Sequence, residues 1–261
     1  MLPSMSRRQF TSRASALLAH AATGGCRGGL DEPTADAARL HSRTTGSGAT
    51  PTVGFQPLGL SSGRDGFIYV SPSVSVSTPT PLMVLLHGAT GSAEQWRTGG
   101  IEAMVDGLGV VVMCPSSRDR TWDFWTTGWG ADVQFIDAAL AKTFERCRID
   151  PTRIALGGFS DGASYGLSLG VFNGDLFSHL IGFSPGFLAA AGRNGAPKVY
   201  IQHGTADAVL PLSGARGIVE LLRTRGYDVT FTEFDGGHEV SDAQQRAAAT
   251  WFVPPSPLAV R

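Results

Sequence analysis

The sequence predicts an α/β protein with a mostly parallel central sheet and helices on both faces. From about residue 53 onward, short apolar runs alternate with segments whose apolar residues have helical spacing. Several runs are continuous Val, Ile and Leu, as expected of strands that are covered on both faces. In such sheets a ligand site forms beyond the carboxyl ends of the strands, so we look for functional residues where strands end.

The expected strands are short apolar runs bounded by turn residues. They cover residues 67–70, 82–86, 110–114, 153–156, 180–183, 199–202 and 229–234.

The expected helices lie between these runs. Ser92 and Ser241 are each followed three residues later by Gln, which is the capping-box pattern of a helix start. Residues 132–146 carry apolar side chains at helical spacing, and a helix that opens at Ser213 has one stripe of apolar residues, Ile218, Leu221 and Leu222.

The N-terminal part is expected to be an address and not part of the fold. Residues 6–10 resemble a twin-arginine export signal, and the small residues before Cys26 resemble a bacterial lipoprotein cleavage site. The predicted organisation is an export signal at 1–26, a flexible linker at 27–52 and one domain at 53–261. Export to the periplasm or the exterior, or membrane anchoring through lipidated Cys26, is the expectation; a disordered basic tail on a cytoplasmic protein is the alternative.

Composition excludes several classes of function. The chain of 261 residues has a formal net charge of −1, which gives no basic face for nucleic acid. The sequence has no run of about 18 apolar residues, so it predicts no membrane-spanning helix. Cys114 and Cys147 fall at opposite edges of the predicted sheet, so we expect buried thiols and no disulfide. No metal-ligand cluster or phosphate-binding loop is present, and we expect no cofactor and no metal.

A nucleophilic serine is the first candidate for chemistry. The pattern G-x-S-x-G is weak here because 34 residues are Gly, and it occurs five times. A nucleophile elbow needs a strand, a tight turn that carries the Ser, and then a helix whose first amide is free. Only Ser160 meets all three requirements; the centres of the other matches, which fail at least one, are Ser61, Ser164, Ser168 and Ser184.

A histidine base and a carboxylate should complete the site. His238 follows the last strand in a glycine loop, and Asp207 follows the strand before it, so the chain order is the one this arrangement uses. Asp235 is a rival acid, but it is only three residues from the base and fits a turn. His87 is expected to brace its own loop, and His203 to lie too close to the next turn to act as the base.

The developing oxyanion needs backbone donors. The N–H groups of Ala89, in the loop after an early strand, and of Asp161, directly after the nucleophile, are the expected pair.

Four motifs in this order resemble the phospholipase/carboxylesterase branch of the α/β hydrolases. They are the LLHG loop, the GFSDG elbow, the HGTAD acid loop and the GGH base loop, within residues 54–252. Residues 132–136 and 148–154 are also similar to secreted polyhydroxybutyrate depolymerases and feruloyl esterases. Asp161 departs from both groups, which often have Gln or Asn there. The resemblance implies a cofactor-free serine esterase that acts on a small-molecule or polymer-end ester.

Two other features bear on the substrate. The segment between the strands at 180–183 and 199–202 is too short for a large lid. The loop at 118–131 holds Trp122, Trp125 and Trp129, which either wall a substrate pocket or pack the loop. A serine exopeptidase or amidase, or a binding protein that has lost catalysis, remains an alternative function. The oligomeric state is left open.

Overall fold

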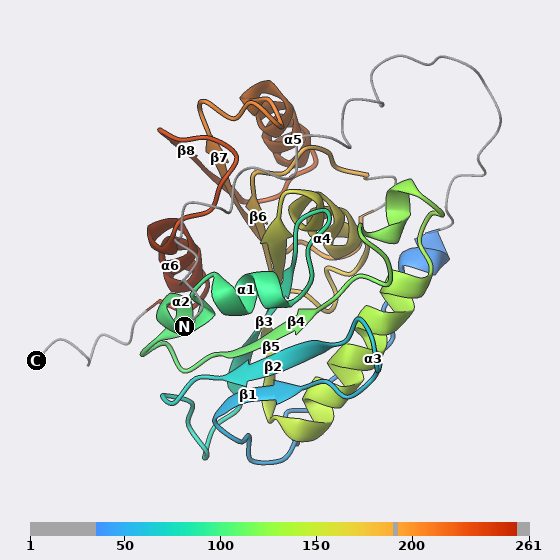
Figure 1. Cartoon of the computed structure of the whole chain (residues 1–261), viewed down its shortest axis with the longest axis vertical. Helices are drawn as coiled ribbons and strands as arrows, with labels where there is room; N and C mark the ends of the chain where they lie inside the picture. The colour runs from blue at the N-terminus through green and yellow to red at the C-terminus, as the bar shows by residue number, and fades with distance from the viewer. Residues whose placement is uncertain (1–34, 190–192, 255–261) are drawn as a thin grey trace, which may run out of the picture.

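A computed structural model describes residues 35–189 and 193–254 (Figure 1). The predicted export signal at 1–26, with Cys26, and the linker residues up to 34 lie outside the described residues.

A sheet of eight strands crosses the molecule in the order β1-β2-β4-β3-β5-β6-β7-β8. The strands are β1 Gly54–Pro57, β2 Gly66–Val70, β3 Thr80–Leu86, β4 Val111–Pro115, β5 Ile149–Phe159, β6 His179–Phe183, β7 Lys198–Gly204 and β8 Val229–Phe234. The helices are α1 Glu94–Thr98, α2 Ile101–Val105, α3 Ala131–Arg146, α4 Asp161–Phe172, α5 Leu212–Thr224 and α6 Asp242–Phe252, with 3-10 turns η2 Ala35–Ala38 and η3 Asp123–Trp125. The predicted fold class is confirmed.

Most neighbouring strands of the sheet run in the same direction, so their carboxyl ends lie at one edge of the sheet. Strands β3 to β8 pair in parallel, whereas β1 and β2 are antiparallel to their neighbours. All seven predicted strands form. Strand β1 was not predicted, because Gly54 and Pro57 bound a half-exposed run of only four residues that no apolar pattern marks.

Two apolar layers cover the sheet because its side chains alternate. On β3, Leu82, Val84 and Leu86 belong to a cluster with helices α3, α4 and α5. Met83 and Leu85 point the other way and join α1, α2 and α6. The strands are thus buried on both faces, which is the physical reason for their continuous apolar sequences.

One of the two predicted capping boxes forms. Ser241 accepts a hydrogen bond from the Gln244 N–H, and the Gln244 side chain accepts from the Ser241 N–H. The box predicted at Ser92 is wrong: α1 begins after Ala93, and Gln95 Oε1 accepts the Gly88 N–H at 2.8 Å instead.

The stripe predicted on α5 is correct only in part. Ile218 and Leu222 are buried in the layer formed with β7, whereas Leu221 is exposed.

The linker prediction is wrong for residues 35–52. Ala38 and Leu40 are completely buried, and Asn173 bonds to both: its Oδ1 accepts the Leu40 N–H and its Nδ2 donates to the Ala38 carbonyl. Asp137 Oδ1 accepts the N–H groups of residues 41 and 42 at 2.8 Å. This part of the chain, which we call the N-terminal strap (residues 38–49), is therefore an ordered part of the domain.

Cys114 and Cys147 are buried free thiols, as predicted. Within the described ranges, none of the helices has both the length and the apolar character needed to cross a bilayer.

Candidate active site

Ser160 lies on a strained turn between β5 and α4. Its backbone has φ 56° and ψ −116°, a conformation that L-residues rarely adopt. Gly158 and Gly162 make the turn possible: a Cβ on Gly158 would lie 2.6 Å from Gly162 backbone atoms, and one on Gly162 would lie 2.4 Å from the His87 carbonyl oxygen. The two glycines of the motif therefore let α4 approach the end of β3 while the Ser160 side chain is presented at the sheet edge.

The structure brings the three predicted side chains together. His238 Nε2 lies 2.8 Å from Ser160 Oγ, and His238 Nδ1 lies 2.7 Å from Asp207 Oδ2. A carboxylate oxygen only accepts, so Nδ1 carries the proton and Nε2 is free to accept the Ser160 hydroxyl. The hydroxyl, the imidazole and the carboxylate form one continuous hydrogen-bonded chain.

Asp207 is fixed through both carboxylate oxygens. Oδ1 accepts the N–H groups of Val209 and Leu210 at 2.9 and 2.8 Å, while Oδ2 faces His238. Burial alone would raise the pKa of Asp207, but donors from two histidines and the Leu210 amide outweigh it and lower the pKa below the ordinary Asp range. The group therefore stays ionised opposite the imidazole.

The acid and base loops are joined by their backbones. The Thr205 N–H donates to the Phe234 carbonyl, and the Ala206 N–H donates to the Gly236 carbonyl. A Cβ on Gly204 would lie 2.3 Å from the Gly237 carbonyl oxygen. Close packing of these two glycine loops sets the separation of the carboxylate and the imidazole.

His203 is a second histidine on the same carboxylate. Its Nε2 lies 2.8 Å from the Leu210 carbonyl oxygen and 3.2 Å from Asp207 Oδ2. Both partners are acceptors, so Nε2 carries a proton and points at the acid. The sequence placed His203 near the site but gave it no contact with Asp207; its position four residues before the acid in a strand-end turn was the available signal.

His87 braces the loop after β3. Its Nδ1 donates to the Gly88 carbonyl at 2.8 Å, and its Nε2 accepts the Ser117 N–H at 3.0 Å. Burial lowers the pKa of His87 to about 4, so the ring stays neutral at pH 7.

The amides expected to bind an oxyanion belong to the two segments next to Ser160, the loop after β3 and the start of α4. Ala89 follows Gly88, whose Cβ, if present, would lie 3.5 Å from Ser160 Cβ, and Asp161 is the first residue of α4. Among the turn and loop hydrogen bonds of the described residues, neither amide is a donor. The Asp161 side chain is bound elsewhere, since its carboxylate accepts hydrogen bonds from Thr121 Oγ1 and the Trp122 N–H. Burial raises the pKa of this carboxyl group.

The other serines of the repeated pattern have structural contacts. Ser164 and Ser168 lie inside α4, where each hydroxyl donates to the carbonyl four residues earlier and accepts a loop amide of residues 186–189. Ser184 is buried and precedes Pro185.

Two of the three tryptophans in the loop at 118–131 pack in the core and do not wall a pocket. Trp122 and Trp129 are only 1% and 7% exposed and pack on Tyr165, and Trp122 Nε1 donates to the His87 carbonyl. Trp125 alone is exposed, at 61%, against Phe187. These two indole rings belong to the core because their apolar area is large, and the Trp122 N–H has a buried acceptor.

Two buried carboxylates hold this loop. Asp123 and Asp132 each accept the backbone N–H of the other at 2.8 Å, and Tyr165 donates to Asp123 at 2.9 Å. Burial raises the pKa of Asp132 to about 6. These hydrogen bonds hold the loop against Tyr165 of α4, the helix that begins directly after Ser160.

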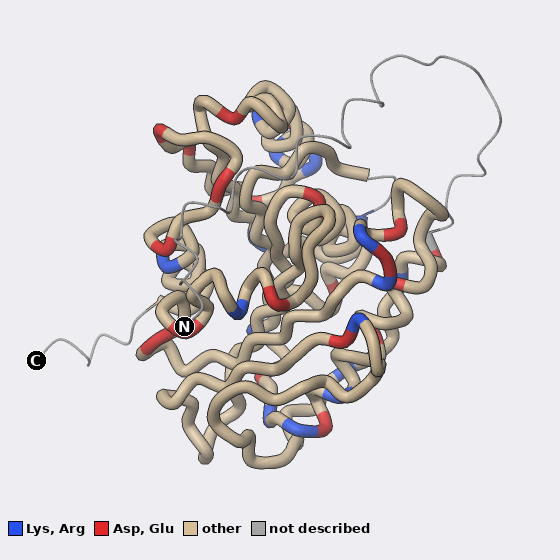
Figure 2. The backbone as a smooth tube through the Cα atoms, in the orientation of Figure 1, with Lys and Arg blue, Asp and Glu red and all other residues tan. Residues whose placement is uncertain are grey.

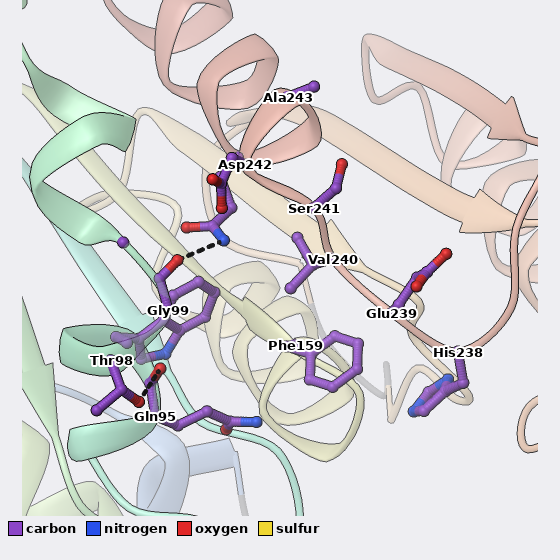
Figure 3. A pocket seen from close by; sticks show the side chains of 13 residues that line it. Gln95, Thr98, Gly99, Phe159, His238, Glu239, Val240, Ser241, Asp242 and Ala243 are labelled. Atoms are coloured by element: carbon purple, nitrogen blue, oxygen red, sulfur yellow. Dashed lines mark hydrogen bonds between the residues drawn. The ribbon is translucent and has the colours of Figure 1, made fainter. Parts of the chain in front are cut away.

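A cavity of about 680 Å³ lies next to His238, which is one of its lining residues (Figure 3). It lies between α1 and the stretch that leads into α6, and Phe159 and Val240 are among its apolar lining residues. Nothing in the sequence marked this cavity, because its walls come from three separate segments. Over the described ranges, no group of three or more His, Cys, Asp or Glu side chains is arranged to hold a metal ion.

Comparison with known proteins gives two kinds of match. Residues 132–253 match the phospholipase/carboxylesterase family model. NocK of Nocardia uniformis subsp. tsuyamanensis, a protein named as an esterase, is 29% identical over 144 residues, which are 51% of this chain and 42% of NocK. The bifunctional acetylxylan esterase/xylanase XynS20E of Neocallimastix patriciarum is 28% identical over 62% of this chain and 24% of its own length. The chain thus spans less than half the length of either relative.

The fold is similar to that of solved structures. The S-formylglutathione hydrolase FrmB of Staphylococcus aureus superposes with a TM-score of 0.61, covering 79% of this chain and 100% of that one at 17% identity. At this identity the likeness concerns the fold, which agrees with the family match over residues 132–253. Residues 132–253 therefore match the phospholipase/carboxylesterase family, and the fold of the chain is similar to that of this S-formylglutathione hydrolase.

Proposed function

We propose that the protein is a serine hydrolase that cleaves carboxylic esters through Ser160, His238 and Asp207. The observation that carries this proposal is the hydrogen-bonded chain from the Ser160 hydroxyl through His238 to Asp207, at 2.8 and 2.7 Å. Such a chain activates a hydroxyl that is otherwise a weak nucleophile.

The first half-reaction forms an acyl-enzyme. Ser160 Oγ attacks the ester carbonyl carbon while His238 Nε2 takes the hydroxyl proton, and Asp207 stabilises the resulting imidazolium. When the tetrahedral intermediate collapses, the bond to the alcohol oxygen breaks and His238 gives its proton to that oxygen. In the second half-reaction water attacks the acyl-enzyme by the same route, which releases the acid and restores Ser160.

Backbone amides would stabilise the negative charge of both intermediates. The N–H groups of Ala89 and Asp161 are assigned this role because each is fixed beside Ser160 by the glycine turns. One donor of this kind is worth about 3 kcal/mol in the transition state.

Replacement of the nucleophile tests the proposal. Ser160→Ala should lower kcat for p-nitrophenyl acetate by roughly 10⁶-fold, with an unchanged thermal unfolding transition, and should abolish labelling by a fluorophosphonate probe. Near-normal turnover by the variant would refute the assignment of the nucleophile.

Two further outcomes separate the alternative functions. Faster cleavage of aminoacyl anilides than of p-nitrophenyl esters by the wild-type protein would identify a peptidase. A wild-type protein that neither turns over esters nor takes the fluorophosphonate label would be a binding protein.

A further inference from the structure

The cavity beside His238 has a distinct position relative to the reacting groups. His238 and Phe159 are among its lining residues, and their rings pack together with centroids 4.9 Å apart. Ser160, Ala89 and Asp161 are not among the lining residues. The cavity therefore adjoins the base and not the proposed oxyanion site.

This position matters because His238 contacts the alcohol half of the ester when that half leaves the acyl half. In the proposed mechanism the alcohol oxygen leaves by taking the proton from His238 Nε2, so it must come within hydrogen-bonding distance of that atom. In the same mechanism the carbonyl oxygen of the ester faces the amides of Ala89 and Asp161, which are not among the residues that line the cavity. A cavity that touches the imidazole but not the amides is placed to hold the alcohol half.

The walls of the cavity indicate what kind of alcohol it accepts. Phe159, Val240 and the buried Trp96 supply apolar surface, and Figure 3 shows the Val240 side chain between Phe159 and the start of α6. A volume of about 680 Å³ lies within the range of small-molecule sites and is ample for an aromatic ring.

The charge around the cavity is one-sided. Charges of both signs are scattered over the molecule (Figure 2). Among the described residues that line the cavity, however, the acidic groups are Glu239 and Asp242, and none is Lys or Arg. Glu239 is one of the residues that line the cavity, so its carboxylate disfavours an anionic group that enters the cavity.

We infer that this cavity is the leaving-group subsite, and that it selects esters of uncharged or cationic alcohols with a bulky apolar part over esters of anionic alcohols. The inference rests on the proposed function and adds the half of the ester that the cavity binds and the charge it accepts.

A series with one acyl group and varied alcohols tests the charge preference. We expect kcat/KM for the acetate esters to be higher with benzyl alcohol or choline than with the anion of glycolic acid. Glu239→Gln should raise the glycolate-to-choline ratio of kcat/KM by up to about 25-fold, because loss of one charge at contact distance in water changes kcat/KM about fivefold for each of the two oppositely charged alcohols. Glu220→Gln, which removes an exposed carboxylate on α5, is the matched control and should leave the ratio unchanged.

A change of cavity volume tests which half of the ester is bound. Val240→Phe should lower kcat/KM for benzyl acetate relative to methyl acetate by about tenfold, and Val240→Ala should not. The ratio for p-nitrophenyl hexanoate over p-nitrophenyl acetate, which varies the acyl half, should stay the same. Val76→Phe is the control, since Val76 is an exposed valine that is not among the residues that line the cavity.

The outcomes separate this inference from the proposed function. If Val240→Phe changes the acyl ratio and leaves the alcohol ratio unchanged, the cavity holds the acyl half and the inference is wrong. If Glu239→Gln leaves the glycolate-to-choline ratio at the wild-type value, the charge selection is wrong. In both cases a wild-type enzyme that still depends on Ser160 would keep the proposed function intact.

Discussion

Asp207 accepts hydrogen bonds from two histidines, and only one of them contacts the nucleophile. His238 bridges to Ser160, whereas His203 is buried and also donates toward the Leu210 carbonyl. We assign His203 the role of holding the carboxylate, because its second acceptor ties it to the acid loop. The orientation of the acid thus depends on contacts made within one strand-end turn.

Replacing the acid should separate it from its rival in the sequence. Asp207→Asn should lower kcat for p-nitrophenyl acetate by about 10³- to 10⁴-fold, because the wrong tautomer of His238 is then favoured. Asp235→Asn is the matched control: Asp235 is exposed, and its loss should leave kcat near the wild-type value. A larger loss for Asp235→Asn than for Asp207→Asn would reverse the assignment.

His87 makes stability depend on pH. The pKa of His87 in the folded protein is about 4, below the ordinary 6.5, so folding favours the neutral ring. Its contribution is complete above pH 6.5 and is lost as the pH falls through 6.5 toward 4. The loss amounts to about 3 kcal/mol in the free energy of unfolding.

Urea unfolding at several pH values measures this effect. Between pH 7 and pH 4 the wild-type protein should lose more stability than His87→Gln, which has no titrating group at this position. Equal losses in the two proteins would contradict the pKa assigned to His87.

Helix α4 meets the sheet through glycines that are not equivalent. A Cβ on Gly162 would lie 2.4 Å from the His87 carbonyl oxygen, whereas one on Gly166 would have only ordinary contacts, at 3.5 Å. The two glycines are four residues apart in α4, but only Gly162 is closed in by backbone atoms at short distance.

The pair gives a test with a built-in control. Gly162→Ala should destabilise the fold by about 1–3 kcal/mol and reduce kcat, because α4 must move away from the end of β3. Gly166→Ala should be neutral or stabilise by up to about 1 kcal/mol through helix propensity. Thermal unfolding and p-nitrophenyl acetate turnover of both variants check the prediction; equal effects would contradict it.

The N-terminal strap extends the core across α3 and α4. Leu40 is completely buried, and Arg39 and Arg43 both contact Asp175 after α4. The domain of this protein therefore begins before residue 53, and the strap links the start of the described chain to the helix that carries Ser160 at its N-terminus.

Truncating a buried side chain in the strap should lower the free energy of unfolding as much as truncating one in the sheet core. Leu40→Ala should lower the free energy of unfolding by about 2–4 kcal/mol. Leu60→Ala, at a leucine that is 36% exposed, is the control and should change it by less than about 0.5 kcal/mol. A free linker would make the two variants alike, which chemical denaturation would show.

Local patterns in the chain were enough to predict the strands, the helix at 132–146 and the elbow at Ser160. A doubly covered strand must be apolar along its length, and a strand-turn-helix with Gly at both sides of Ser has few other uses. Chain order then singled out Asp207 and His238, since each follows a strand of the same parallel sheet.

Contacts between distant segments determine the features that local patterns did not predict. The burial of Leu40 depends on Asn173, and the burial of Trp122 on Tyr165 and the His87 carbonyl. The cavity beside His238 has walls from α1, β5 and the start of α6. A polar or glycine-rich segment such as the strap has no periodic signal of its own, so its place is fixed only when its partners are assembled around it. Short-range sequence carries the signal of an element, whereas the partner of a side chain is a property of the assembled fold.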